Sequence, residues 1–493
     1  MFNKILIANR GEIAVRIIRT CRDMGIGTVA LYEADDLGSL HVRLADEAVE
    51  LHTPRGYLDQ DAVLAAALQT GAPAIHPGYG FLAERLDFIA ACRRAGVIFI
   101  GPPLAVMQAQ QDKLAVLNRV RAAGFPTADY SPHSFDLTDV DAVRAEADRQ
   151  GYPVVIKSCL GGRGRGAYTA RSAQQLDRAL RRAQAEAQLV YGSSRFYVER
   201  VVSPAHLVGV QIIGDDHGGL IHLGEREGSL IRGNQKMLEE APAPCLSAEL
   251  RAQVWQTALE IARLLQLRSA ATIEFNVDLA GRFMFTEVKP RIQIEHPVTE
   301  MISAVDIVRE QIRVAAGERL SVTQTDVQLR GHAISCRITA EDPWHHYMPS
   351  PGRLRRVRLP SGPGLRIDTY AYSGCAVPAQ YDPVVAKVIA WGNDRAEAVH
   401  RMRRALGEIE LIGTATTLPI HQVIVQHPDF LAADYHTDSL RRDLPDDQLP
   451  VDEARDLAVA AAIAYARRNL AARPMLPDRL QSGWHRSSRR LPD

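Results

Sequence analysis

Two glutamates lie at positions where a β-hairpin would bring them face to face. Strand-like segments flank the four-residue loop 279–282, and the register this predicts runs from Asp278 opposite Phe283 to Glu274 opposite Glu287. Side chains directly opposed across a hairpin lie about 5 Å apart, and like charges there repel. Mg²⁺ prefers oxygen ligands and usually binds substrate phosphates as well. The segment therefore predicts a magnesium site; the alternative is a solvated face on which two glutamates coincide.

Polar residues then continue at every second position of the second strand. They are Glu287, Lys289, Arg291, Gln293 and Glu295. If the chain stays extended, all five side chains share one face, and Pro290 favours a sheet edge or a bulge because it lacks a backbone donor. Such a row could hold a metal ion, a phosphate and a carboxylate-like substrate together. An ordinary amphipathic edge strand is the alternative.

A glycine-rich stretch at 161–166 follows Lys157, which ends an apolar strand. Glycines let backbone N–H groups approach phosphate oxygens, and such a loop can close as a lid. The stretch lacks the GxxxxGK[ST] pattern of a P-loop, and no GxGxxG follows the first strand of the chain. Taken alone, it is as consistent with an ordinary turn as with a phosphate site.

Lysine is scarce in this sequence of 493 residues. Only six of the 58 basic residues are lysine, namely Lys4, Lys113, Lys157, Lys236, Lys289 and Lys387. Because an ammonium group is a compact point charge on a flexible stem, these lysines mark positions where an arginine fork would not serve as well.

Composition excludes several classes of protein. The 58 basic residues balance 58 acidic ones, which argues against bulk attraction to nucleic acid or to an anionic membrane surface. The six cysteines are scattered without a CxxC pair, so we expect free thiols in a reducing compartment and no zinc site. No signal peptide or membrane-spanning run is apparent, and we expect a cytoplasmic protein.

Short apolar runs alternate with helical patterns over the first part of the chain. Strands are predicted at 4–8, 27–32, 74–76 and 97–100, with helices between them. This alternation is typical of βαβ units in a mostly parallel sheet. Further strands are predicted at 154–157 and 195–201, with a charged helix at 173–189 between them, and a tail helix is predicted at 453–472.

Longer strings point to a family. From about residue 1 to 446 the sequence resembles the ATP-grasp superfamily, and closely its biotin carboxylase members. The resemblance rests on ILIANRGEIAVRIIR (5–19), AIHPGYGFLAE (74–84), FIGP (99–102), QKMLEEAPAP (235–244), PRIQIEHPVTEM (290–301), RGHAISCRITAEDP (330–343) and VPAQYDPVVAKVI (377–389).

The resemblance implies an α/β fold in several parts. These are an N-terminal βαβ domain (1–112), an ATP-grasp domain (113–330) with a mobile lid at about 130–203, a C-terminal α+β domain (331–446) and a helical tail (447–493). It also implies ATP and Mg²⁺ (or Mn²⁺) as cofactors, and biotin as a substrate on a separate biotin carboxyl carrier protein. A carboxyltransferase partner, an acyl-CoA carboxylase of fatty acid biosynthesis and a homodimer are implied as well.

The family's functional residues carry over one by one. Residues implied to bind ATP are Lys113, Lys157, Gly164, Gly166, Glu199, His206, Glu274 and Glu287, of which the last two would also bind the metal. Bicarbonate would be held by Lys236, Arg291 and Gln293. Glu295 would be the base that deprotonates bicarbonate, and Arg337 would stabilise the enolate-like form of biotin.

Several positions depart from the family pattern, all in the ATP and metal half. Lys289 occupies the expected third ligand position, where the family has an asparagine that helps to bind a second magnesium ion. The others are Leu160 and Arg163 in the glycine loop, Ile231 and Asn234 near the nucleotide, and Val208-Gly209 in place of an acidic residue.

Three functions are compatible with this pattern. The first is a biotin carboxylase subunit that forms carboxyphosphate from ATP and bicarbonate and carboxylates biotin. The second is a divergent ATP-grasp ligase with another acceptor, and the third is a non-catalytic carboxylase paralogue. The intact Glu295 and Arg337 favour the first; the altered loop and Lys289 favour the others.

Overall fold

The computed structural model describes residues 1–160, 166–186, 193–233, 235–442, 459–463 and 465. One compact unit comprises residues 1–343 and 347–443, and a second comprises 344–346 and 444–493. In the second unit, residues 459–463 and 465 are helical, whereas the rest of the predicted tail helix at 453–472 lies outside the described residues. None of the described helices has the length and apolar character needed to cross a membrane.

The N-terminal part of the first unit is a five-stranded parallel sheet, as the βαβ pattern predicts. Its order is β3-β2-β1-β4-β5. The strands are β1 (Lys4–Ile7), β2 (Gly27–Tyr32), β3 (Glu47–Glu50), β4 (Ala74–His76) and β5 (Ile98–Phe99), and the helices are α1 (Gly11–Asp23), α2 (Leu40–Leu44), α3 (Gln60–Thr70) and α4 (Leu86–Arg94). The inner strands β1, β2 and β4 are short apolar runs that are largely buried, as is usual in a parallel sheet, whereas β3 and β5 at the two edges are partly exposed.

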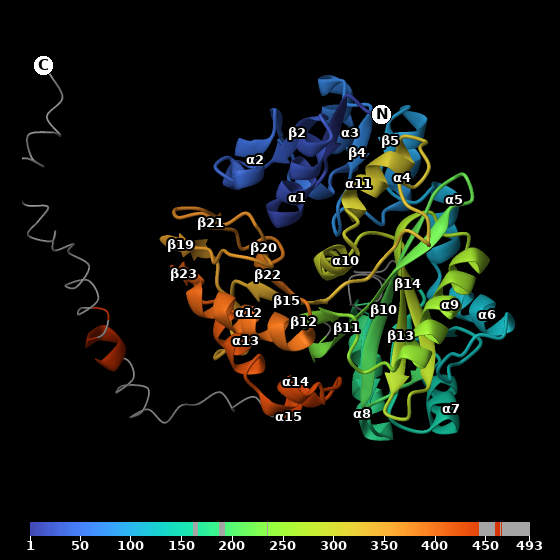
Figure 1. Cartoon of the computed structure of the whole chain (residues 1–493). Coiled ribbons are helices and arrows are strands. Elements are labelled where there is room, and N and C mark those ends of the chain that lie inside the picture. The colour runs from blue at the N-terminus through green and yellow to red at the C-terminus, as the bar shows by residue number, and fades with distance from the viewer. Residues whose placement is uncertain (161–165, 187–192, 234, 443–458, 464, 466–493) are drawn as a thin grey trace, which may run out of the picture. The chain divides into compact units, whose positions relative to one another are not determined.

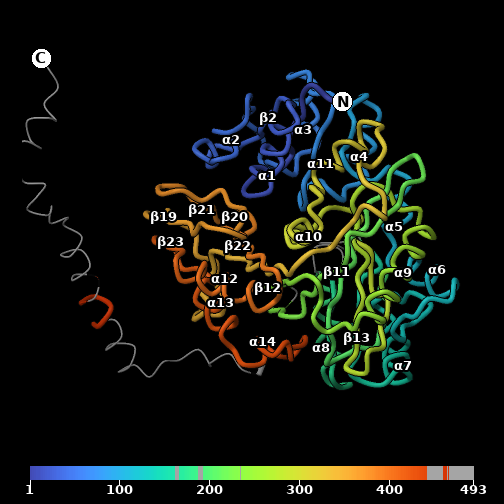
Figure 2. Tube along the Cα trace, viewed as in Figure 1, coloured from blue at the N-terminus to red at the C-terminus, as the bar shows by residue number. Residues whose placement is uncertain are grey.

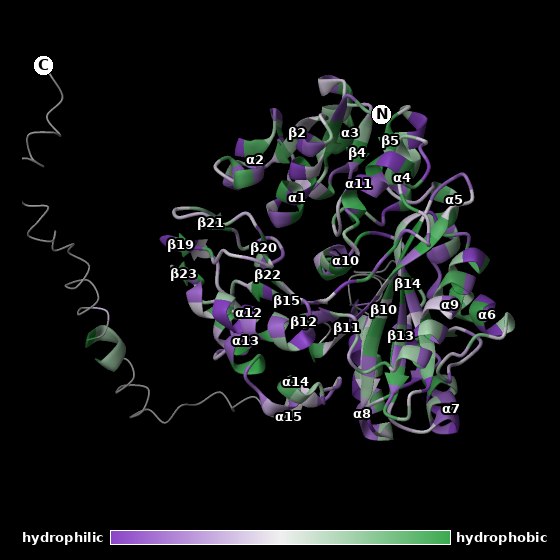
Figure 3. Ribbon diagram, viewed as in Figure 1, coloured by the Kyte–Doolittle hydropathy of each residue, from purple (hydrophilic) through white to green (hydrophobic). Residues whose placement is uncertain are grey.

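An eight-stranded antiparallel sheet forms the centre of the unit, in the order β14-β13-β10-β11-β12-β15-β22-β20. Its strands are β10 (Ala205–Gly214), β11 (Leu220–Arg232), β12 (Gln235–Ala241), β13 (Ser269–Asp278), β14 (Phe283–Lys289), β15 (His332–Thr339), β20 (Leu365–Thr369) and β22 (Val384–Gly392). Helix α9 (Ala248–Leu264) packs on β10 and β11 (Figure 1). Hydrophobic residues dominate β10, whereas α7 is largely hydrophilic (Figure 3).

A smaller four-stranded sheet, in the order β6-β9-β7-β8, carries the residues on either side of the glycine-rich stretch. Its elements are β6 (Phe135–Asp136), α7 (Val140–Gln150), β7 (Val154–Ser158), β8 (Ala167–Ala170), α8 (Ala173–Glu186) and β9 (Arg195–Arg200). It has its own hydrophobic core, which includes Val154, Ile156, Leu176 and Phe196. A separate core is what a lid subdomain needs if it is to move as one body.

Helix α10 (His296–Ser303) lies against β11, β12, β15 and β22, and so packs on strands from both halves of the central sheet (Figure 2). The other helices are α5 (Leu104–Gln110), α6 (Lys113–Ala122), α11 (Ile307–Ala315), α12 (Arg395–Glu408), α13 (Leu418–Ile424), α14 (Pro428–Ala432) and α15 (Ser439–Arg442). The remaining strands are the short pairs β16 (Glu341–Asp342) with β17 (Met348–Pro349), β18 (Gly352–Arg353) with β21 (Ala376–Val377), and β19 (Arg356–Arg358) with β23 (Glu410–Ile412).

Candidate active site

The predicted hairpin is β13–β14, and Glu274 lies directly opposite Glu287, as expected. The register nearer the turn was predicted wrongly, because Phe283 pairs with Val277 and not with Asp278. Asp278 is the last residue of β13, and its carboxylate accepts the backbone N–H of Ala280 in the loop at 3.0 Å. A bulge after Glu274 absorbs the one-residue shift and leaves the glutamates facing each other.

The chain does not stay extended along the polar row, which was the condition for its five side chains to share one face. Strand β14 ends at Lys289, and the chain turns at Pro290, so that the Arg291 N–H donates to the Lys289 carbonyl at 2.8 Å. Gln293 and Glu295 lie beyond the end of β14, and both are buried. The turn nevertheless brings the row's polar groups to the carboxylate pair, because it folds the chain back over the sheet.

Lys236 forms ion pairs with Glu274, an expected metal ligand, and with Glu295, the expected base. Its Nζ lies 3.0 Å from Oε1 of Glu274 and 2.6 Å from Oε1 of Glu295. Burial lowers the pKa of Lys236, but the two carboxylates outweigh it and hold the pKa above its usual value. Burial would raise the pKa of Glu295, whereas Lys236 and Arg226 hold it well below its usual range. Glu295 is therefore ionised, as a base must be before it accepts a proton.

Two further lysines form ion pairs with Glu287, the second expected metal ligand. Oε2 of Glu287 is 2.8 Å from Nζ of Lys289 and 3.4 Å from Nζ of Lys113. Burial would raise the pKa of Glu287, but Lys289 and Lys113 outweigh it and hold this pKa well below its usual value. For Lys113, burial lowers the pKa more than Glu287 raises it. Both lysines contact the same carboxylate oxygen.

Arg291 and Gln293, predicted to bind bicarbonate, are held partly by Glu84 and Arg226, which the sequence did not single out. Nε of Arg291 donates to Oε1 of Glu84 at 2.8 Å, and Nε2 of Gln293 donates to Oε1 of Glu274 at 2.9 Å. Arg226, a fully buried side chain, donates to the Gln293 amide oxygen and to Oγ1 of Thr272. The signal in the sequence was the run of three charged residues, Glu225, Arg226 and Glu227, in the middle of β11.

Arg337 lies on β15 beside β12, close to this cluster. Its side chain is buried, and Nε has no hydrogen-bond partner among the described residues. The same holds for Oγ of Ser335 and for Oε1 of Glu239, which pair across β15 and β12. Buried polar atoms without partners are costly. These three atoms are therefore suited to a polar ligand or to water.

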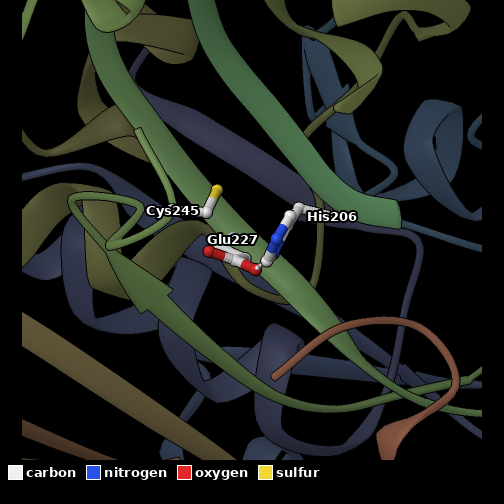
Figure 4. Close-up of side chains that lie close together, drawn as sticks. All are labelled: His206, Glu227 and Cys245. Atoms are coloured by element: carbon white, nitrogen blue, oxygen red, sulfur yellow. Dashed lines mark hydrogen bonds and ion pairs between the residues drawn. The ribbon is translucent and has the colours of Figure 1, made fainter. Parts of the chain in front are cut away.

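Three other residues expected to bind ATP, Lys157, Glu199 and His206, lie in two separate pairs. Nζ of Lys157 lies 2.6 Å from Oε1 of Glu199. Nδ1 of His206 lies 2.7 Å from Oε1 of Glu227, with Cys245 beside them (Figure 4). This contact fixes the imidazole ring through Nδ1 and leaves Nε2 for a ligand. No ion pair among the described residues joins either pair to the carboxylate cluster.

The glycine-rich loop is only partly described. Gly164 and Arg163 lie outside the described residues, as does Asn234. Gly166 has a positive φ of 79°, and its carbonyl accepts the Ser158 N–H at 2.9 Å. A side chain at this φ would be strained, which explains why glycine stands at this end of the loop.

The donor set fits one Mg²⁺ ion. Oε1 of Glu274 and Oε2 of Glu287 are engaged by lysines, whereas Oε2 of Glu274 and Oε1 of Glu287 have no bond to any described residue. Mg²⁺ is usually bound by one or two carboxylates together with substrate phosphates. The two unengaged oxygens on facing strands provide that arrangement, and the surrounding lysines suit a polyphosphate.

Comparisons with known proteins agree with this architecture. Family models match three consecutive segments: "Biotin carboxylase, N-terminal domain" at 1–107, "Carbamoyl-phosphate synthase L chain, ATP binding domain" at 112–323, and "Biotin carboxylase C-terminal domain" at 335–442. The chain is 45% identical over 440 residues to the biotin carboxylase of Nostoc sp., covering 88% of this chain and 98% of that protein.

Other relatives serve different carboxylases. The propionyl-CoA carboxylase alpha chain of Ruegeria pomeroyi is 41% identical over 493 residues, covering 94% of this chain and 72% of that protein. Among solved structures, the biotin carboxylase domain of Hydrogenobacter thermophilus 2-oxoglutarate carboxylase matches with a TM-score of 0.87 and 40% identity, covering 90% of this chain and all of that chain. That domain was solved as a dimer in complex with MgADP, ADP and bicarbonate.

Proposed function

The chain belongs to the biotin carboxylase family of ATP-dependent ligases, and from this premise we propose that it carboxylates the biotin of a separate carrier protein. The observation that carries the proposal is the position of Lys236, whose ammonium group links Glu274 to Glu295. One side chain thus couples a residue suited to MgATP to a residue suited to deprotonate bicarbonate. Bound bicarbonate would lie next to the phosphate that it attacks.

Glu274 and Glu287 would hold Mg²⁺, which shields the negative charge of the phosphates during transfer. Lys113 and Lys157 would bind phosphate oxygens, and each would leave the carboxylate that it contacts in this structure. Gly164 and Gly166 would approach the phosphates from the loop, and Glu199 and His206 would hold the nucleoside. We also propose the division into parts at residues 112, 330 and 446.

Glu295 would take the proton of bicarbonate, and the resulting carbonate oxygen would attack the γ-phosphorus. ADP leaves, and carboxyphosphate forms. Arg291 and Gln293 would orient the anion, since Glu84 and Glu274 fix their side chains. Arg337 would face the developing oxyanion of biotin, where a permanently charged guanidinium needs no proton transfer.

The identity of the carboxylated acceptor depends on a partner carboxyltransferase. Relatives of this chain belong to pyruvate, propionyl-CoA and 2-oxoglutarate carboxylases. We propose an acyl-CoA carboxylase in the cytoplasm, because the match to the propionyl-CoA carboxylase alpha chain extends over 94% of this chain. We further propose a homodimer, as in the solved 2-oxoglutarate carboxylase domain.

The test is an assay of ADP release by the purified full chain. We expect turnover that requires bicarbonate and rises with free biotin or a biotinylated carrier domain, together with incorporation of labelled bicarbonate into biotin. Turnover that ignores biotin would indicate another acceptor. Nucleotide binding without turnover would indicate a non-catalytic paralogue.

A further inference from the structure

Lys289 lies where it can act on the metal site. It is the last residue of β14, opposite Thr272, and its side chain is 14% exposed. Its ammonium group lies 2.8 Å from the Glu287 oxygen that Lys113 also approaches. This position excludes the alternative that Lys289 is a surface lysine whose side chain points to solvent.

The charges around the carboxylate pair balance without a metal ion. Four carboxylates and four cations form three separate sets of ion pairs: Glu84–Arg291, Lys113–Glu287–Lys289 and Glu274–Lys236–Glu295. Opposed glutamates alone would need an external cation. Lysines supply that charge here, so the need for divalent ions is reduced.

The strand on the other side of Glu274 adds to this effect. Gly209 of β10 pairs directly with Glu274, and Val208-Gly209 replaces the acidic residue that the family pattern predicts. A Cβ at position 209 would meet Cγ2 of Thr272 at 3.0 Å, so this chain leaves little room for a side chain there. One negative charge is absent and one positive charge is added, a difference of two, which is the charge of one Mg²⁺ ion.

We propose that Lys289 is a built-in cation of this site, so that one divalent metal ion binds with the nucleotide where the family pattern predicts two. Lys289 occupies Oε2 of Glu287, and the single ion binds the oxygens that the lysines leave unengaged. The inference rests on the proposed function, since it assumes that the nucleotide binds at this cluster.

The test counts metal ions and does not depend on turnover. Mn²⁺, whose paramagnetism reports bound ions, is titrated into the full chain with a non-hydrolysable ATP analogue and followed by electron paramagnetic resonance. We expect one Mn²⁺ per bound nucleotide in the parent and in Lys289→Arg, which keeps the charge. We expect two in Lys289→Asn and Lys289→Gln, with affinity for the second ion at least tenfold higher than in the parent.

Controls keep folding and function separate from the inference. In the neutral variants without nucleotide, Glu287 still has Lys113 within 3.4 Å, so folding can be compared with the parent before the analogue is added. Lys4→Gln is the matched control, because Lys4 pairs with Glu47 on the surface. Two ions in the parent, or equal counts in the parent and Lys289→Asn, would overturn the inference and leave the function standing. A parent that binds no nucleotide would contradict the function, and with it the inference.

Discussion

Glu239 is a buried carboxyl group for which the proposed reaction has no assigned step. It lies among charged groups of β11, β12, β15 and the turn after β14: Lys236, Arg226, Arg337 and Glu295, with Cys336 nearby. Burial and the negative charge of Glu295 raise the pKa of Glu239 to about 7, against the lowering effect of Arg337. Glu239 thus holds a proton that an exposed glutamate would release near pH 4.5.

This difference predicts how stability changes with pH. Because the folded pKa is raised, the contribution of Glu239 is fully present below the unfolded pKa and is lost as pH rises toward about 7. A single group changes the free energy of unfolding by at most about 1.4 kcal/mol per pH unit. In Glu239→Gln, which cannot ionise, urea unfolding should lose this slope between pH 4.5 and 7. Identical slopes in parent and variant would show that Glu239 is ionised in the folded protein.

Glu295 gives the most direct test of chemistry at the residue scale. Replacing Glu295 by Gln removes the base but keeps the side-chain shape, so turnover should fall by roughly 10²–10⁴-fold. Nucleotide affinity should change little, because Lys236 still pairs with Glu274. Steady-state kinetics and nucleotide titration separate the two effects. Glu47→Gln, at the surface partner of Lys4, is the control for loss of one carboxylate; unchanged turnover in Glu295→Gln would exclude Glu295 as the base.

At the scale of elements, the β13–β14 hairpin depends on its loop. Asp278 accepts backbone N–H groups of Ala280 and Arg282 at 3.0 and 2.9 Å, and Arg282 also pairs with it through a side chain that is 81% exposed. Asp278→Ala should lower the free energy of unfolding by about 1 kcal/mol, because two loop donors lose their acceptor. Arg282→Ala should cost less than about 0.5 kcal/mol, because exposed ion pairs are weak. Equal losses in urea unfolding would mean that Asp278 stabilises the hairpin through its ion pair with Arg282 and not through its hydrogen bonds to the loop backbone.

The hairpin also shows how far sequence patterns reach. Local periodicity was sufficient to place β2 and β4 and to predict that Glu274 faces Glu287. It could not predict the bulge after Glu274, or that the Asp278 carboxylate accepts N–H groups of the loop, because alternation encodes neither. Nor could it find Glu84, whose contact with Arg291 spans 207 residues of sequence. Such partners depend on how whole elements pack.

At the scale of the molecule, the central sheet crosses the proposed boundary at residue 330. Strand β12 of the ATP-grasp part pairs with β15 of the C-terminal part, which places Arg337 near Lys236. Arg16 of α1 binds Glu300 and Asp306, and Glu300 also binds Arg366 of β20. The N-terminal and C-terminal parts are therefore tied to α10, the helix that directly follows Glu295.

Lys387 forms the most deeply buried of these ion pairs between elements. On β22, its Nζ lies 2.9 Å from Oε2 of Glu12 on α1 and 3.1 Å from the carbonyl of Ile294, next to the proposed base. Lys387 is 1% exposed and Glu12 is 3% exposed. The lysine thus joins α1, the turn before α10 and β22 through one charge.

Removing that charge should destabilise the whole unit. Lys387→Met leaves Glu12 buried without its cation, which costs about 3–5 kcal/mol when one partner of a buried pair is lost. Burial already raises the pKa of Glu12, and without Lys387 this pKa should rise further. The loss of stability should therefore grow with pH, because Glu12 ionises in the unfolded protein at a lower pH than in the folded one. Adding Glu12→Gln should recover most of the loss in urea unfolding. A double variant as unstable as Lys387→Met would show that the unpaired Glu12 carboxylate is not the cause of the loss, since Lys387 also lies 3.8 Å from Asp368 and 3.1 Å from the Ile294 carbonyl.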